Sequence, residues 1–102
     1  MSNSYRKGYR AEKKVADLVG GKRVGILGKE DISDPHGVFS YEVKMRKKLP
    51  KFLKDCYEQA RANCTAGKHP VVILKEKNKR YDDAFVIMRL RNFLSWLHKK
   101  EE

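Results

Sequence analysis

Apolar and polar residues recur with several different periods along the chain, and each period predicts a different element. In residues 3–20 apolar side chains return every three or four positions, which is typical of one buried face of a helix. The glycine pair Gly20-Gly21 predicts the end of that helix. Residues 22–27 and 30–32 are short β-type pieces, followed by the turn-forming sequence Asp34-Pro35-His36-Gly37. This stretch predicts a β-hairpin.

Residues 39–44 alternate strictly between apolar and polar side chains. In a strand, successive side chains point to opposite faces, so Phe39, Tyr41 and Val43 would line one face. The polar residues would line the other face; they are Ser40, Glu42 and Lys44. The pattern therefore predicts a third strand with one polar face.

The second half of the chain predicts a helix, a strand pair and another helix. Pro50 suits the first position of a helix over residues 50–65, which has an apolar stripe and ends before Gly67. Residues 70–74 and 84–88 are continuous apolar runs, typical of strands buried on both faces, as parallel strands usually are. The polar residues 75–83 predict a hairpin loop between them. A last amphipathic helix is expected over residues 89–99.

These elements follow one another in the order α-β-β-β-α-β-β-α, which predicts an α/β fold with helices packed on a mixed sheet. A chain of 102 residues provides one small core, so we expect a single domain over residues 1–102. The longest apolar runs have five residues, far fewer than the ~20 that span a bilayer. The polar start of the chain predicts no signal peptide and a cytoplasmic location. Cys56 and Cys64, eight positions apart on a predicted helix, are expected to be free thiols.

The chain is strongly basic, with 24 Lys and Arg residues against 13 Asp and Glu residues and a formal net charge of +11. Such an excess favours a polyanionic partner. Basic residues gather in the first predicted helix and directly after the alternating strand, and both groups predict phosphate-contacting surfaces. Their candidate DNA-binding members are Arg6, Lys7, Arg10, Arg46, Lys47 and Lys48.

The alternating strand also carries candidate chemistry. Glu42 and Lys44 would share its polar face, and the preceding turn supplies Asp31 and Asp34. Mg²⁺ prefers oxygen ligands, so two of these carboxylates and the backbone carbonyl of Val43 would suffice to bind it. The ammonium of Lys44 would then hold or help to deprotonate an attacking water. The alternative is an edge strand with a solvated, ion-pairing face.

Glu12 lies on the apolar face of the first predicted helix, because Val15, Ala16 and Val19 follow it at helical spacing. A carboxylate on that side is costly unless it is paired or faces a metal. Glu12 would therefore either complete the carboxylate cluster or pair with a basic neighbour, Arg6 or Lys13.

Gln59 shares a helical row with Phe52, Cys56 and Asn63, which would turn its amide toward the sheet. The alternative is a buried amide satisfied by the backbone.

Taken together, several of these segments resemble the restriction-endonuclease-like nuclease superfamily with its P-D…(D/E)-x-K signature. The resemblance covers residues 5 to about 90 and rests on Arg6-Lys7-Gly8 through Glu12, Asp31-Ile32, Tyr41-Glu42-Val43-Lys44 and Gln59. Within that superfamily, the Arg-Lys-Gly opening and the helical glutamate resemble the archaeal-type Holliday junction resolvases and their phage-borne relatives.

The resemblance implies a mixed sheet of about five strands flanked by helices. It also implies a homodimeric, Mg²⁺-dependent endonuclease that hydrolyses phosphodiester bonds in branched DNA such as four-way junctions, with Mn²⁺ as a substitute ion. Glu12, Asp31, Glu42 and Lys44 would stand in the catalytic positions, with Gln59 as an auxiliary residue. The metal ligands would be Asp31, Glu42, the Val43 carbonyl and Glu12.

One position departs from the family pattern, because Asp31 follows Glu30 rather than a proline, and Pro35 follows Asp34. We favour Asp31 over Asp34 as the metal ligand, since a β-branched residue follows it and eleven positions to Glu42 leave room for a hairpin. Two other functions stay open. One is a non-catalytic nucleic-acid-binding module, and the other is a general nuclease of the same fold without junction selectivity.

Overall fold

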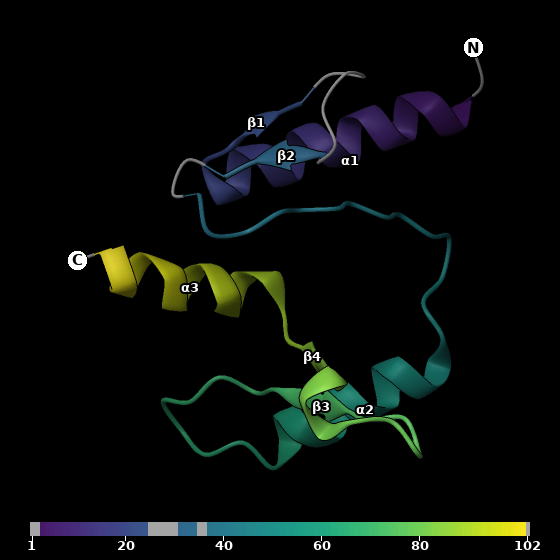
Figure 1. The fold of residues 1–102 in the computed structure, drawn as a ribbon, viewed down its shortest axis with the longest axis vertical. Coiled ribbons are helices and arrows are strands. Elements are labelled where there is room, and N and C mark those ends of the chain that lie inside the picture. Colours follow the sequence, from purple (N-terminus) through teal and green to yellow (C-terminus); the bar gives the residue numbers. More distant parts are fainter. Residues whose placement is uncertain (1–2, 25–30, 35–36, 102) are drawn as a thin grey trace. The chain divides into compact units, whose positions relative to one another are not determined.

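A computed structural model describes residues 3–24, 31–34 and 37–101, and these belong to two compact units, Met1–Lys47 and Lys48–Glu102 (Figure 1). In the described residues the elements follow the order α1, β1, β2, α2, β3, the short 3-10 helix η1, β4 and α3. The first unit contains α1, β1 and β2, and the second contains the remaining elements.

Helix α1 spans Asn3–Val19 and ends as the sequence predicts, at the glycine pair. Gly20 adopts a left-handed conformation with φ 74°. The N–H of Gly21 then donates to the carbonyl oxygen of Ala16 at 2.9 Å, which satisfies one of the last helical carbonyls. The chain thereby reverses direction and leads straight into β1.

Strands β1 (Lys22–Arg23) and β2 (Ile32–Ser33) pair antiparallel, with Arg23 opposite Ile32. This pairing confirms the base of the predicted hairpin. The N–H of Val24 continues the ladder by donating to the carbonyl of Asp31 at 3.0 Å. The remainder of the predicted hairpin, residues 25–30, lies outside the described residues, as do Pro35 and His36 of the following turn.

The core of the first unit lies where α1 packs on this strand pair. Ile32 is fully buried, and Ala16 and Val19 of α1 are buried as well. A Cβ atom at Gly21 would overlap the carbonyl oxygen of Ser33 and lie 2.9 Å from Cγ2 of Ile32, so the close approach of helix end and strand requires glycine here.

Residues 39–44 run beside β2 but form no regular strand. Tyr41 makes an isolated antiparallel bridge with Ile32, and the Asp31 N–H donates to the Tyr41 carbonyl at 3.1 Å. The predicted alternation nevertheless holds, because the odd-numbered side chains are half-buried and the even-numbered ones are exposed. The prediction of two faces is confirmed, whereas the prediction of a continuous strand is wrong.

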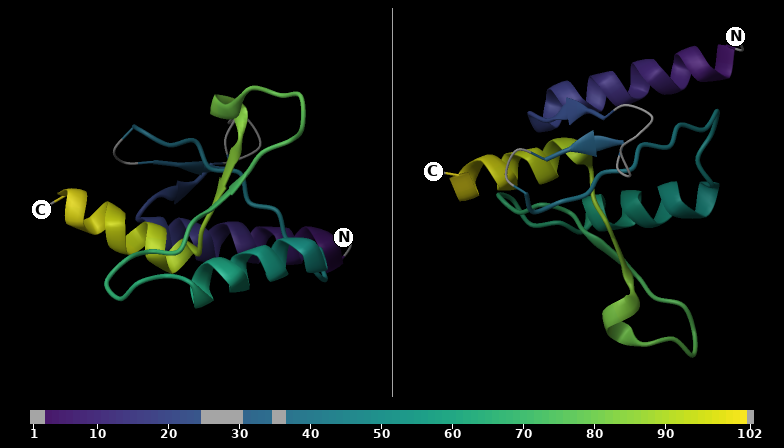
Figure 2. Two further views of the ribbon diagram at one scale, coloured as in Figure 1. Left: turned by 90° about the horizontal axis from the view of Figure 1, so that it is seen from below. Right: turned by 45° about the horizontal axis from the view of Figure 1, so that its top comes forward.

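The second unit opens with α2 (Lys51–Ala62), which Pro50 precedes as N-cap. The helix ends short of the predicted residue 65, because Asn63 caps it and the Cys64 N–H donates to Arg61 in a tighter turn. Strands β3 (Val72–Leu74) and β4 (Phe85–Ile87) pair antiparallel and are joined by a loop that contains η1 (Tyr81–Asp83). Helix α3 spans Leu90–Glu101 (Figure 2), close to the predicted range.

The predicted five-stranded mixed sheet is wrong. The described strands form two separate two-stranded antiparallel sheets. The continuous apolar runs suggested parallel strands buried on both faces, but Ile73 and Val86, which face each other across β3 and β4, are 63% and 64% exposed. A loop as short as residues 75–83 joins neighbouring strands only in antiparallel fashion, since a parallel connection needs a crossover of a dozen or more residues.

Two simpler expectations can be compared directly with the structure. Cys56 and Cys64 are free thiols, as predicted. In the part of the chain that the structure describes, no helix combines the length and the apolar character that crossing a bilayer requires.

Candidate active site

Asp31 is anchored from two sides in the first unit. Its backbone bonds to Val24 on the β1 side and to Tyr41 on the other side, as described above. Its carboxylate oxygen Oδ2 accepts a hydrogen bond of 2.7 Å from the backbone N–H of Val43. The structure therefore places the Asp31 carboxylate against the backbone between Glu42 and Lys44, although they lie more than ten positions apart in the sequence.

Glu42 and Lys44 lie on the solvent side of this segment. Lys44 Nζ stands 4.0 Å from Glu42 Oε2, with the two side chains 85% and 57% exposed, respectively. An ion pair this exposed contributes at most about 1 kcal/mol to stability. The geometry matches the alternative of a solvated ion-pairing face, and it also leaves both groups accessible to a phosphodiester.

Glu12 points toward the strands, as predicted, and has a basic partner that the sequence did not predict. The side chain of Arg6, one of the two predicted partners, lies outside the described residues. Oε2 of Glu12 lies 2.6 Å from Nε of Arg23 on β1, and both side chains are more than two-thirds buried. The guanidinium carbon of Arg23 also lies 4.4 Å from the centre of the Tyr9 ring. Arg23 is thus held between a carboxylate and an aromatic ring.

Arg23 is the residue at this site that the sequence analysis missed. Arg23 belongs to no recognisable sequence motif. It meets Glu12 only because the turn at Gly20-Gly21 folds β1 back over α1. The available signal was the unpaired Glu12 on a core-facing helix row, which requires a cation from whichever strand covers that row.

Asp34 has a structural role in the turn that follows β2. Its Oδ2 accepts hydrogen bonds from the backbone N–H groups of Val38 and Phe39 at 3.0 and 2.9 Å. Its carbonyl accepts another from Gly37, which has φ 67°. These bonds are typical of an aspartate that closes a loop.

The Tyr41 hydroxyl is buried and has no hydrogen-bond partner among the described residues. Burial raises the pKa of this hydroxyl above its ordinary value, and the negative charge of Asp34 raises it further. The Tyr41 hydroxyl therefore ionises at a higher pH than a free tyrosine side chain does. Its backbone carbonyl accepts the hydrogen bond from Asp31 described above.

The donor atoms here are hard oxygens, which fit Mg²⁺ in kind. Asp31 and Glu42 supply carboxylates, and the Val43 carbonyl lies between Glu42 and Lys44. Glu12 is occupied by Arg23 instead. Over the described ranges, no three His, Cys, Asp or Glu side chains converge closely enough to hold an ion by themselves. Mg²⁺ keeps several waters and binds through one or two carboxylates, so Asp31 and Glu42 fit the ion in the type and number of their donor groups.

No family model matches the sequence, and neither the curated proteins nor the solved structures contain a match to it.

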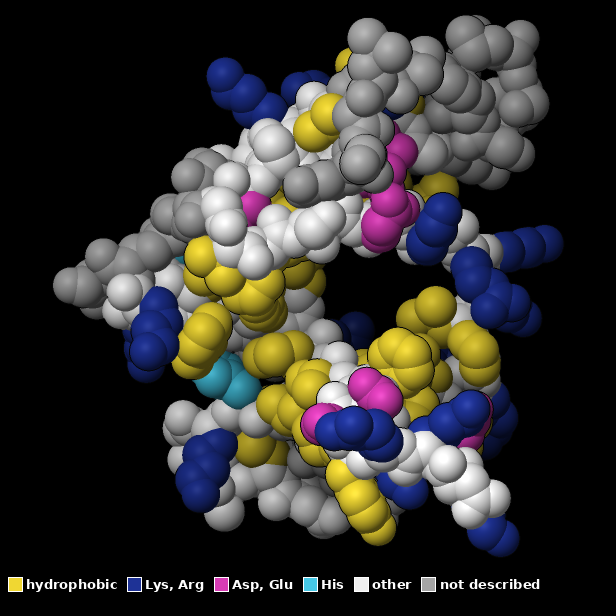
Figure 3. All heavy atoms as spheres, viewed as in Figure 1, with side chains coloured by type: hydrophobic (Ala, Val, Ile, Leu, Met, Phe, Trp, Pro, Cys, Tyr) yellow, Lys and Arg dark blue, Asp and Glu magenta, His cyan; other side chains and the backbone are white. Residues whose placement is uncertain are grey.

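The predicted basic residues are exposed wherever their side chains are described. Figure 3 shows many Lys and Arg side chains, in dark blue, on the face in view. Arg10 lies with Lys13 and Lys14 along a shallow groove on α1 of about 200 Å³, which Tyr9 and Asp17 complete. The described residues after the alternating segment are also exposed; they are Arg46, Lys47 and Lys48. The side chains of Arg6 and Lys7 lie outside the described part of the structure.

The predicted orientation of Gln59 is wrong, because its side chain is exposed on α2 in the second unit. Phe52, on the same helical row, is 64% exposed, whereas Tyr57 is buried. The helix therefore turns the Leu53 and Tyr57 side toward its own unit. Cys56 is half-buried and lies between the exposed row that contains Gln59 and the buried row that contains Tyr57. Its apolar character therefore did not show which row faces the unit.

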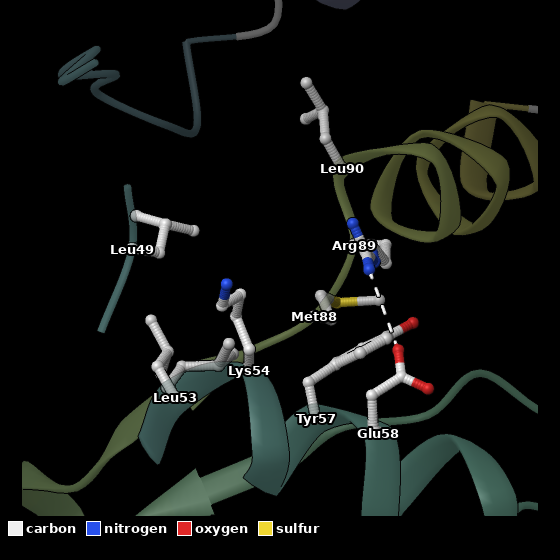
Figure 4. A pocket seen from close by; sticks show the side chains of 9 residues that line it. Leu49, Leu53, Lys54, Tyr57, Glu58, Met88, Arg89 and Leu90 are labelled. Carbon is white, nitrogen blue, oxygen red and sulfur yellow. Dashed lines mark ion pairs between the residues drawn. The ribbon is translucent and has the colours of Figure 1, made fainter. Parts of the chain in front are cut away.

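A separate apolar groove of about 410 Å³ lies in the second unit between α2 and the end of β4 (Figure 4). Arg89 crosses its edge, 4.8 Å above the Tyr57 ring and 4.0 Å from a carboxylate oxygen of Glu58. None of the predicted catalytic residues lines this groove.

Proposed function

We propose that this protein is a metal-dependent, structure-selective DNA endonuclease of the Holliday junction resolvase type. The observation that carries the proposal is the 2.7 Å hydrogen bond from the Val43 N–H to Asp31 Oδ2. This bond brings Asp31 beside the Glu42-Val43-Lys44 segment. These are the two parts of the D…(E)-x-K pattern, and they are separated in the sequence.

Asp31 and Glu42, with the Val43 carbonyl, are the residues that would hold Mg²⁺. When bound, the ion polarises a phosphodiester and lowers the pKa of a coordinated water. Lys44, exposed beside Glu42, would place a positive charge next to the attacked phosphate. Glu12 would act through Arg23, whose guanidinium it holds in place beside Tyr9.

Affinity for DNA would come from dispersed phosphate contacts. The net charge of +11 attracts a polyanion, and exposed basic groups lie both on α1 and directly after Lys44. Contacts of this kind position the DNA backbone and carry little sequence information. Selection would therefore depend on the shape of the DNA.

Paired cleavage of a four-way junction needs two active sites at a fixed distance. Each chain offers one candidate site, so a two-fold homodimer would supply the pair. A broad basic surface with two sites suits a four-way junction better than a straight duplex.

A non-catalytic nucleic-acid-binding module is the second candidate. The observation that favours it is that Glu12 and Glu42 both already have basic partners, at 2.6 and 4.0 Å. Such a module would bind the same DNA and leave it intact.

Incubation of the purified protein with a labelled four-way junction and a matched duplex, with Mg²⁺ and with excess chelator, tests the proposal. We expect paired nicks in the junction only when the metal is present. Undiminished cutting in chelator would overturn the metal-dependent mechanism. Equal cutting of duplex and junction would favour a general nuclease, and binding without cutting would favour the module.

A further inference from the structure

The loop between β3 and β4 is built around one exposed aromatic side chain. Figure 2 shows this loop projecting beyond α2 as the outermost turn of the hairpin. Tyr81, the first residue of η1, is 83% exposed, the highest value among the large apolar side chains of the described residues. A tyrosine this exposed contributes little to the stability of the fold, so its side chain is free to contact a partner.

The loop holds Tyr81 in a defined position. The N–H groups of Asp83 and Ala84 donate to the carbonyls of Arg80 and Tyr81 at 3.2 and 3.1 Å, which forms the single turn of η1. The Arg80 side chain makes two hydrogen bonds to the carboxylate of Asp82, at 3.0 and 2.9 Å. The backbone under the tyrosine ring is therefore ordered before any partner binds.

One positive charge lies directly against the ring, whereas Asp82 and Asp83 follow Tyr81 in η1 and Asp82 is paired with Arg80. Lys75 Nζ lies 4.3 Å from the centre of the Tyr81 ring, from the opposite arm of the loop. Lys77 and Lys79 follow in the same loop and are exposed. Asn78 turns the chain between them with φ 65°, so the two lysines flank the tip of the hairpin.

We propose that this hairpin tip binds nucleic acid by stacking Tyr81 on an unpaired or unstacked base. Lys75, Lys77 and Lys79 contact the adjacent phosphates. A base with a free face is found in single strands and at branch points but not inside a continuous duplex. The inference rests on the proposed function and deepens it, because it gives the molecule a means of recognising the centre of a branched substrate.

The test measures binding in buffer without divalent ions, which prevents cleavage. The probes are a labelled single strand, a labelled duplex, and a four-way junction that carries 2-aminopurine at its branch point. For the single strand and the junction, Tyr81→Ala is expected to weaken binding at least about fivefold. For the junction it should also abolish the change in 2-aminopurine fluorescence. Tyr81→Phe keeps the ring and should stay within about twofold of the wild type.

Phe52→Ala serves as the matched control. Phe52 is an aromatic residue of the same unit, lies outside the hairpin and is 64% exposed. The Phe52→Ala variant should bind all three probes as the wild type does. Since Tyr81 is so exposed, its variants should keep the wild-type melting temperature.

Wild-type affinity of Tyr81→Ala for the single strand and the junction would overturn the proposal, as would equal losses in Tyr81→Ala and Phe52→Ala. Wild-type affinity of Tyr81→Ala is also the result expected if the hairpin tip binds another protein. A further outcome is that the wild type fails to cut junctions with Mg²⁺ and still binds them in a way that depends on Tyr81. That outcome would contradict the proposed nuclease activity but support the role of the hairpin.

Discussion

Asp31 is the residue on which the site geometry depends most. Replacing it by Asn would remove the charge of the proposed metal ligand, so we expect junction cleavage to fall about a hundredfold or more. Asp34→Asn should be much milder, because an amide oxygen still accepts the two turn hydrogen bonds from Val38 and Phe39. Single-turnover cleavage of a labelled junction compares the two variants. The opposite order of effects would show that Asp34 is the ligand.

Tyr41 allows a test of the same region through stability. Because its buried hydroxyl lacks a partner among the described residues, Tyr41→Phe should stabilise the protein by about 1 kcal/mol. The raised pKa of the hydroxyl disfavours its ionised form in the folded state. The wild type should therefore lose stability as the pH rises above about 10, and the Phe variant should lose less. Urea unfolding at neutral and alkaline pH measures both effects, and a less stable Phe variant at neutral pH would contradict them.

At the residue scale, the sequence predicted which way several side chains point but not which residues they contact. Helical spacing correctly turned Glu12 inward, and strict alternation correctly separated the faces of residues 39–44. The partner of Glu12 depended on how β1 returns over α1, and no local pattern encodes that path. The prediction for Gln59 was wrong because Cys56 lies between the exposed row of α2 and its buried row.

At the scale of elements, the junction of α1 with the strands gives the clearest stability prediction. Gly21→Ala should lower the free energy of unfolding by about 1–3 kcal/mol, because the added methyl group overlaps the Ser33 carbonyl. Gly8→Ala is the matched control within α1, since nothing lies within 4 Å of its added Cβ. It should raise helix stability by roughly 0.5–1 kcal/mol. Similar effects of both substitutions on urea unfolding would contradict the described packing.

The helices and turns were predictable because their signals are local. The glycine pair, Pro50 and the apolar stripes marked α1, α2 and α3 within a few residues. The sheets were not predictable in the same way, since pairing depends on contacts between distant segments. A continuous apolar run could not reveal that one face of β3 and β4 is exposed, as Ile73 shows.

At the scale of the whole molecule, charge should dominate DNA binding. Replacing Arg46, Lys47 and Lys48 by Ala should reduce the slope of log affinity against log salt by about two to three, if each contacts a phosphate. Removing the same charge from α3, by replacing Arg91, Lys99 and Lys100, should change the slope less. Binding titrations over a range of salt concentrations measure both slopes. Equal changes would mean that binding depends on net charge and not on the predicted surface.

The most direct test of the central claim is junction cleavage by Glu42→Gln in the presence of Mg²⁺, measured beside its affinity for the same junction. Glu42 is exposed and makes only a 4.0 Å ion pair, so the variant should fold normally. We predict that cleavage is lost while affinity stays within about twofold of the wild type, because the proposed affinity would come from dispersed basic residues. Wild-type cleavage by Glu42→Gln would contradict the proposed active site.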